Sequence, residues 1–351
     1  MKKSLFVLPA IAFACAANAQ SSVTLFGVVD ATLTAGKGSL SDRTQLGRGG
    51  LTTNRLGFRG TEDLGGGLSA GFWLEAGFNP DDGQGLNTNT NNQASGTATA
   101  PSGTQGLTFG RRATVSLASK TWGELRVGRD YVPQYWGMFF GDPFGNVGVG
   151  AIVNYTTIIT GFSSTRASNS IGYWSPDVAG FRAHLMHYRG ENASNVATAD
   201  DGTGTGLRVT YGAGRFNIGA AYARTDYAAG DVVQRNISAD WDFQLVKLMG
   251  VYNSDRNGAL TARGAALGAV VPVGAGQFKA AYSYYRTSAV GRPQAKKLSL
   301  GYVHNLSKRT AVYGTYARVR NSGGSAHALN GATTAANASS SGFDLGLRHS
   351  F

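Results

Sequence analysis

Single arginines recur along this chain in segments where apolar and polar residues alternate. Guanidinium groups stay charged at neutral pH, and a row of them on one surface attracts anions without any covalent chemistry. A few carboxylates in the same segments would lower that positive potential locally. The candidate charged residues are Arg55, Arg59, Glu75, Arg112, Glu124, Arg126, Asp142, Arg166 and Arg208. Their types indicate attraction of small anions.

The alternation assigns most of these side chains to one face. Leu56 and Phe58 share a face of one segment, so Arg55 and Arg59 share the opposite face. Glu75 has the parity opposite to its apolar neighbours. The same rule predicts one polar face for Arg112, Glu124, Arg126, Arg166, Arg208, Lys279, Arg318 and Arg348.

Other chemistries are poorly supported by the pattern. Gly67-Leu68-Ser69-Ala70-Gly71 matches a nucleophile-elbow string, but that elbow joins a strand to a helix, and here a turn enters an alternating strand. His184 and His187 would face opposite sides of a strand, so we predict no metal site and no cofactor. The basic residues are dispersed and lack a stacking module, so we predict no nucleic-acid partner.

The elements that must position these charges are strands with a period of two. We predict sixteen strands, near 22–34, 51–62, 68–79, 106–119, 123–131, 167–175, 180–189, 206–212, 215–226, 232–240, 243–254, 261–271, 276–288, 296–305, 309–320 and 341–351. Short turns alternate with long loops near 35–50, 80–105, 132–166, 190–205 and 321–340. An even number of strands with this layout is typical of outer-membrane barrels, which turn the apolar face to lipid and the polar face to the lumen. A soluble all-β secreted protein is the alternative.

The third long loop, from about Tyr131 to Arg166, is unusually apolar. It contains Trp136, Phe139 and Phe140 just before Asp142. We expect this loop to pack against the inner wall of the barrel and to present the Asp142 carboxylate to the arginines across the pore.

Length and composition fit an exported barrel. The chain has 351 residues, and only 15% are charged, against about 25% in typical soluble domains. Lys2 and Lys3 precede a short apolar run that ends at Ala17-Asn18-Ala19, so we predict a signal peptide over 1–19 and a single barrel domain over 20–351. Cys15 leaves a lipoprotein alternative open. The formal net charge is +12 for the whole chain.

Several motifs together resemble the trimeric general porins of Gram-negative β-proteobacteria, the group that includes the neisserial porins. The chain carries Ser22–Asp30 as SVTLFGVVD, Asn54–Gly65 as NRLGFRGTEDLG, Gly123–Arg129 as GELRVGR, Asn169–Pro176 as NSIGYWSP and Gly346–Phe351 as GLRHSF. The resemblance implies a sixteen-stranded homotrimer in the outer membrane that passes small hydrophilic solutes. It also implies a third loop folded into the barrel, and a terminal Phe351 that closes the barrel and is presented to the outer-membrane assembly machinery.

The sequence therefore predicts an all-β transmembrane antiparallel barrel with an anion-selective pore. Its expected partners are further copies of the chain, outer-membrane lipid and lipopolysaccharide, and small anionic or hydrophilic solutes. A solute-specific channel for organic acids or phosphate is one alternative. A barrel that acts as an adhesin or enzyme is the other.

Overall fold

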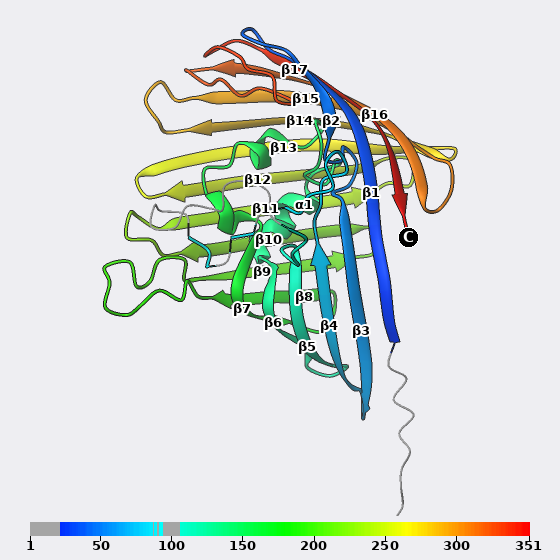
Figure 1. The fold of residues 1–351 in the computed structure, drawn as a ribbon, viewed down its shortest axis with the longest axis vertical. Helices are drawn as coiled ribbons and strands as arrows, with labels where there is room; N and C mark the ends of the chain where they lie inside the picture. Colours follow the sequence, from blue (N-terminus) through cyan, green and yellow to red (C-terminus); the bar gives the residue numbers. More distant parts are fainter. Residues whose placement is uncertain (1–21, 87, 90, 94–105) are drawn as a thin grey trace, which may run out of the picture.

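A computed structural model describes residues 22–351 except 87, 90 and 94–105. The predicted signal peptide over 1–19, Cys15 and part of the loop predicted at 80–105 therefore lie outside the described residues. Figure 1 shows strands that wrap around an interior helical segment. Every strand pairing is antiparallel.

One sheet contains all the strands. Their bounds are β1 Ser22–Lys37, β2 Arg43–Gly47, β3 Arg55–Gly65, β4 Leu68–Ala76, β5 Arg112–Ser119, β6 Gly123–Tyr131, β7 Arg166–Trp174, β8 Phe181–Tyr188, β9 Gly204–Ala213, β10 Phe216–Thr225, β11 Val232–Asp242, β12 Lys247–Asn257, β13 Leu260–Val273, β14 Gly276–Thr287, β15 Gln294–Asn305, β16 Thr310–Ser322 and β17 Ser340–Ser350. β2 is a short strand within the first long loop, so the other sixteen build the wall and the predicted fold is confirmed.

The barrel closes through its first and last strands. One end of β1 pairs with β3 over Ser22–Val28, and the stretch Val28–Lys37 pairs with β17. The five residues of β2 pair with β1 between Thr32 and Gly36, beyond the point where β3 leaves it. Closure satisfies the backbone N–H and C=O groups that lipid cannot. In Figure 1 the blue β1 and the red β17 lie side by side.

Apolar side chains lie on the outside of this barrel. Phe58, Val115, Ile171 and Leu345 are exposed, whereas residues of opposite parity, such as Asp344, are buried or line the interior. This reversal of the soluble-protein pattern is the arrangement that lipid requires. It confirms the predicted parity along most strands.

Two details of the strand predictions are wrong. The strand predicted to begin at 106 begins at Arg112, because the preceding residues belong to the second long loop. Arg318 was expected inside, but it shares its face with the exposed Val312 and Tyr316, while Tyr313 points to the interior. The alternation itself predicts the correct face: Val312 faces lipid, and Arg318 has the same parity as Val312.

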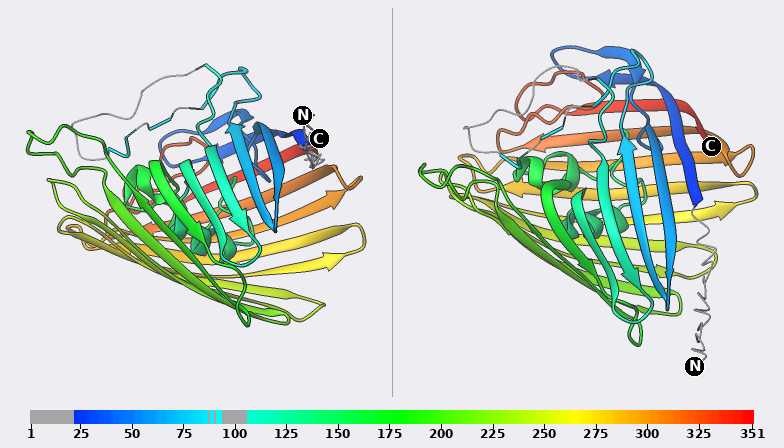
Figure 2. Two further views of the ribbon diagram at one scale, coloured as in Figure 1. Left: turned by 90° about the horizontal axis from the view of Figure 1, so that it is seen from below. Right: turned by 60° about the horizontal axis from the view of Figure 1, so that its bottom comes forward.

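The third long loop lies inside the barrel, as predicted. It contains α1 Pro133–Phe140, α2 Val153–Thr156 and the short 3-10 helix η1 Gly161–Ser164. Pro133 opens α1, a position where its fixed φ and missing N–H cost nothing. Figure 2 shows this segment enclosed by the wall in both views. Within the described part of the chain, no helix is long and apolar enough to cross a membrane.

Apolar contacts attach the loop to the inner face of β11–β16. Met138, Phe144 and Ile152 pack with Val251 of β12 and Ala281 of β14. The wall leaves room for the loop at Gly268, where an added Cβ would collide with the ring of Pro143, so only glycine permits this approach.

Buried polar groups add directional contacts between loop and wall. Lys297 Nζ of β15 donates to the Ala151 carbonyl at 2.6 Å. Asp344 Oδ2 of β17 accepts from the Val149 N–H at 2.7 Å, and Ser283 Oγ of β14 accepts from the Val153 N–H at 3.0 Å. Each contact satisfies a loop backbone group that would otherwise be buried without a partner. The loop position is therefore set by the wall.

Candidate functional site

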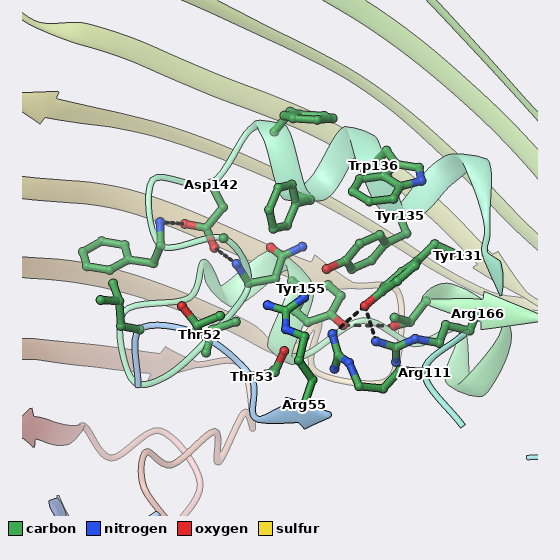
Figure 3. Close-up of a pocket in the computed structure, with 18 of the residues that line it drawn as sticks. Thr52, Thr53, Arg55, Arg111, Tyr131, Tyr135, Trp136, Asp142, Tyr155 and Arg166 are labelled. Carbon is green, nitrogen blue, oxygen red and sulfur yellow. Dashed lines mark hydrogen bonds between the residues drawn. The ribbon is translucent and has the colours of Figure 1, made fainter. Parts of the chain in front are cut away.

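A cavity of about 740 Å³ lies between the third loop and the inner wall, where β3–β7 line one part and β12, β14, β15 and β17 line another. One side is aromatic and comes from the loop, with Tyr135, Trp136, Phe139 and Phe140. The other side is basic and comes from the ends of several wall strands. Figure 3 shows Arg55, Arg111 and Arg166 converging beside Tyr131. The basic side chains lining the cavity are Arg55, Arg111, Arg112, Arg126, Arg166, Lys279 and Arg348.

Glu75 organises one part of this wall. Its Oε1 accepts from Arg111 Nε at 2.5 Å and lies 3.7 Å from Nη1 of Arg55. Its Oε2 accepts from Trp73 Nε1 at 3.1 Å. Glu75 is 4% exposed, so its charge is directed at these neighbours and not at the open lumen. The carboxylate orients two arginines while neutralising only one charge.

The hydroxyl of Tyr131 joins two of the arginines. Arg111 Nη2 donates to this oxygen at 2.7 Å, and Arg166 Nη2 donates to it at 2.5 Å. The Arg166 guanidinium also lies over the Tyr131 ring, with Cζ 4.2 Å from the ring centroid. A neutral oxygen can orient guanidinium groups without cancelling their charge. Arg166 therefore keeps its full charge at the cavity.

A second carboxylate, Asp130, lies between Arg112 and Arg126. Its Oδ2 is 3.4 Å from Arg112 Nε and 3.1 Å from Arg126 Nη1. Arg126 is also paired with Glu124, through Nε to Oε1 at 2.8 Å. Both arginines lie over indole rings, Arg112 over Trp73 at 4.6 Å and Arg126 over Trp174 at 3.9 Å. Ion pairs and rings hold these guanidinium planes in place.

The charge balance of the cavity is positive. Among the described residues that line it, seven are basic and three are acidic. The acids are Glu75, Asp130 and Asp142. The first two are bound to arginines of the same wall, and Asp142 is directed into the loop. The unneutralised positive charge therefore faces the lumen.

Arg59 and Arg208 lie apart from this cavity. Arg59 is four residues further along β3 and is exposed, with Cζ 5.4 Å and 5.1 Å from the ring centroids of Phe26 and Trp73. Arg208 lines a second cavity of about 450 Å³, which shares only Trp136 and Phe140 with the first among the described lining residues. Six of the nine predicted residues border the cavity beside the third loop: Arg55, Glu75, Arg112, Arg126, Asp142 and Arg166. Glu124 does not line this cavity but forms an ion pair with Arg126, which does.

Asp142 does not face the arginines, contrary to the expectation from the sequence. Its carboxylate is 2% exposed and accepts the backbone N–H groups of Phe144, Asn146 and Ile152 at 2.9 to 3.0 Å. Burial raises its pKa above the ordinary value, although these amides and Lys297 favour the charged form. The residue folds the loop instead of charging the pore. Sequence could not reveal this, because a turn carboxylate and a pore carboxylate look alike in the chain.

Phe351 lies at the seam of the barrel. Its N–H donates to the Gly27 carbonyl and its carbonyl accepts from the Gly27 N–H, each at 3.1 Å. Its ring covers Gly27, where an added Cβ would collide with it. The side chain is 45% exposed on the outer surface. The terminal residue thus extends the pairing between the last and first strands by one rung.

Sequence reasoning missed Arg111, Asp130, Tyr131 and Trp73. Arg111 precedes β5, so strand parity does not apply to it, and both Arg111 and Arg112 reach the cavity. Asp130 follows a register shift between Gly128 and Asp130, where φ of Gly128 is +128°. A glycine near the end of an alternating strand is the available signal for such a bulge.

Comparison with known proteins decides the family. The model of the Gram-negative porin family matches residues 5–324. This chain belongs to that family. The porin is 36% identical to outer membrane porin protein 32 of Delftia acidovorans, with all of both chains covered. It is 30% identical to an outer membrane porin protein of Bordetella pertussis, with 91% of this chain and 94% of the relative covered.

A solved structure gives the same relationship. The anion-selective porin from Comamonas acidovorans superposes with a TM-score of 0.83 at 34% identity, covering 95% of this porin and 100% of that chain. These relatives and the closed barrel identify an outer-membrane protein that crosses the membrane many times. The family is not a family of enzymes. The resemblance inferred from the sequence motifs is confirmed.

Proposed function

We propose that this porin is an anion-selective general diffusion channel for small hydrophilic solutes. The supporting observation is the excess of bases over acids around the cavity beside the third loop, described above. Fixed bases along a narrow aqueous path raise the local concentration of anions and lower that of cations. The similar solved structure from Comamonas acidovorans is an anion-selective porin, which supports this proposal.

The proposed mechanism is passive movement down a gradient, without a catalytic step. Arg55, Arg111 and Arg166 attract the anion as it enters the narrow region, and Arg112 and Arg126 continue the basic surface along the wall. Glu75 and Asp130 orient these guanidinium groups through the ion pairs given above. The aromatic loop narrows the path opposite them.

The first test is the reversal potential of the purified protein in a planar bilayer under a KCl gradient. Stepwise conductance with a potential that favours chloride is expected. A potential that favours potassium would refute the anion preference while leaving the channel intact. No conductance from a folded, heat-modifiable barrel would favour an adhesin or an enzyme instead.

One observation favours a narrower function as the second candidate. Two guanidinium groups converge on the Tyr131 hydroxyl, and an oxyanion such as phosphate or an organic acid presents similar acceptors. In a solute-specific channel, chloride conductance falls as phosphate is added and the effect saturates. In a general porin, conductance instead rises in proportion to salt over the same range.

We also propose that the functional unit is a homotrimer, which native electrophoresis before and after heating tests. We propose that the mature chain begins at Gln20, which the intact mass of the exported protein tests. We propose that the terminal Phe351 engages the outer-membrane assembly machinery. A single unheated band at the mass of one barrel would refute the trimeric assembly.

A further inference from the structure

The second cavity, of about 450 Å³, lies between α1 and the inner face of β7–β12, near their short turns. It shares the rings of Trp136 and Phe140 with the cavity beside the third loop, so the two cavities adjoin at these rings. Its volume is in the usual range for sites that hold small molecules, about 300–1,000 Å³. The conduction path proposed above uses the first cavity and leaves the second without a role.

Arg208 of β9 carries an unpaired charge in this second cavity. Two other bases line the cavity, and each has a carboxylate partner. Nε of Arg182 lies 3.0 Å from Oδ2 of Asp177, and Nζ of Lys247 lies 2.9 Å from Oδ1 of Asp240. Within the part of the chain that the structure describes, Arg208 forms no ion pair, and its buried Nε has no hydrogen-bond partner. The cavity therefore has one positive charge that no carboxylate of the described chain offsets.

Uncharged groups hold the Arg208 side chain in place. Its Cζ lies 5.1 Å from the centroid of the Phe140 ring. On the wall, an added Cβ at Gly219 of β10 would press against the guanidinium group, so glycine leaves the room that this side chain occupies. A guanidinium group that is partly buried without a counter-charge is costly, and an anion beside it offsets that cost. Arg112 and Arg126 differ, because carboxylates hold them.

Flat rings surround the unpaired charge. The ring centroids of Trp136 and Phe140 of α1 lie 5.9 Å apart, with 27° between the ring planes. From the wall, Trp174 of β7 stacks on His184 of β8 at 4.1 Å, and His184 is the register partner of Arg208. Nε2 of His184 is buried and has no hydrogen-bond partner among the described residues. The cavity thus combines one unpaired positive charge with the faces of several aromatic rings.

We propose that Arg208 and these rings bind planar aromatic carboxylates that carry a single negative charge. A guanidinium group can donate two parallel N–H bonds to a carboxylate, and the unpartnered Nε of Arg208 provides one of these donors. A ring attached to that carboxylate can pack against the aromatic side chains of the cavity. The single unpaired base matches the single negative charge. This proposal rests on the channel function proposed above and names a class of solute for it.

The test measures the binding of 4-fluorobenzoate to the full-length mature barrel folded in zwitterionic detergent, by the broadening of its fluorine NMR line. Saturable broadening is expected for the wild type. Unlabelled benzoate should displace the probe at a roughly threefold lower concentration than cyclohexanecarboxylate, which has the same charge and a similar size but no aromatic face.

Two variants separate the charge from the ring. R208Q should bind the probe roughly tenfold more weakly, because a hydrogen bond to a charged group contributes about one decimal order or more in affinity. F140L keeps the charge and should reduce the preference for benzoate over cyclohexanecarboxylate. The matched control is R59Q, since Arg59 also lies over two rings but lines neither cavity. R59Q should bind within about twofold of the wild type, because salt screens its distant charge.

Three results would overturn the proposal. One is equal binding by the wild type and a folded, heat-modifiable R208Q, or equal weakening by R59Q. Another is equal displacement by benzoate and cyclohexanecarboxylate, which would mean that the charge alone is recognised. The third is weakening by R55Q in place of R208Q, which would assign the probe to the first cavity.

Equilibrium binding does not require conduction, so its outcome is separate from that of the reversal potential. Saturable binding that depends on Arg208, in a channel that favours potassium, would refute the proposed anion selectivity and support the site. Chloride preference without such binding would refute the site and leave the proposed anion selectivity standing.

Discussion

Arg55 and Arg59 lie four residues apart on one face of β3, but their surroundings differ. Arg55 borders the cavity beside the third loop, whereas Arg59 lies over Phe26 and Trp73 outside it. Sequence parity treats the two as equivalent. The strand is tilted and the loop covers only part of it, so equal parity does not give equal distance from the narrow region.

Replacing Arg55 by Ser is expected to lower the chloride-to-potassium permeability ratio by roughly two- to fivefold, since one unit charge a few ångströms from a solvated ion contributes about 1 kcal/mol or less. Replacing Arg59 by Ser should have a clearly smaller effect. Reversal potentials in a KCl gradient measure both. An equal loss in the two variants would mean that selectivity is set by the total lumen charge and not by this cavity.

Asp142 provides a second comparison at the residue scale. The two carboxylate oxygens of Asp142 accept backbone N–H groups, Oδ1 from Phe144 and Oδ2 from Asn146 and Ile152. In D142N an NH₂ group replaces one of these oxygens, so a donor would face a donor. We expect the loop to lose about 1–3 kcal/mol of local stability. Hydrogen exchange in residues 141–152 should accelerate, and channel noise should rise. A large gain in anion preference with unchanged exchange would instead identify Asp142 as a pore charge.

At the scale of elements, the last long loop contacts the third loop through His327. Its Nε2 lies 3.5 Å from Thr156 Oγ1 of α2, and its backbone groups are paired with Asn321. Burial, together with the smaller effect of the nearby Lys297 charge, lowers the pKa of His327 from 6.5 to about 4. The folded loop therefore favours the neutral imidazole.

The sign of the pH effect follows from this lowered pKa. Above pH 6.5 His327 is neutral both when the last long loop is packed against the third loop and when it is detached, so protonation does not reduce the stability of the packed loop. As the pH falls from 6.5 to about 4, only the open loop binds the proton, and packing loses up to about 3 kcal/mol. Hydrogen exchange of residues 323–339 should accelerate over this interval. H327Q should remove the pH dependence, and an unchanged profile in H327Q would assign it to another group.

At the scale of the whole molecule, closure depends on a few rungs between the first and last strands. Phe351 supplies the last rung through two backbone hydrogen bonds to Gly27 and covers it with its ring. Deleting Phe351 should reduce the yield of heat-modifiable barrel in cells severalfold. Refolding of the same variant from denaturant into detergent separates two causes. A normal yield on refolding in detergent, with a reduced yield in cells, indicates that an assembly signal is lost. An equal reduction in both settings indicates that closure of the barrel is impaired. A normal yield in both settings would contradict both roles of Phe351.

The amino-acid sequence by itself determined the barrel. Alternation along segments such as 343–351 specifies which residues face lipid, because side chains of a strand point to opposite sides in turn. Turn residues and long polar or apolar loops then set the number of strands and the order of pairing. The inward orientation of Arg55, Arg126 and Lys279 follows from this local rule without any knowledge of the rest of the chain.

Only the tertiary structure decided how the charges are grouped. Arg111 joins Glu75 and Tyr131 because the second loop, β4 and β6 end near one another. Asp142 is directed inward to its own loop. Arg208 lines a separate cavity, which shares Trp136 and Phe140 of α1 with the first. Electrostatic interactions depend on distances between segments far apart in the chain, and those distances are fixed by register, closure and loop packing.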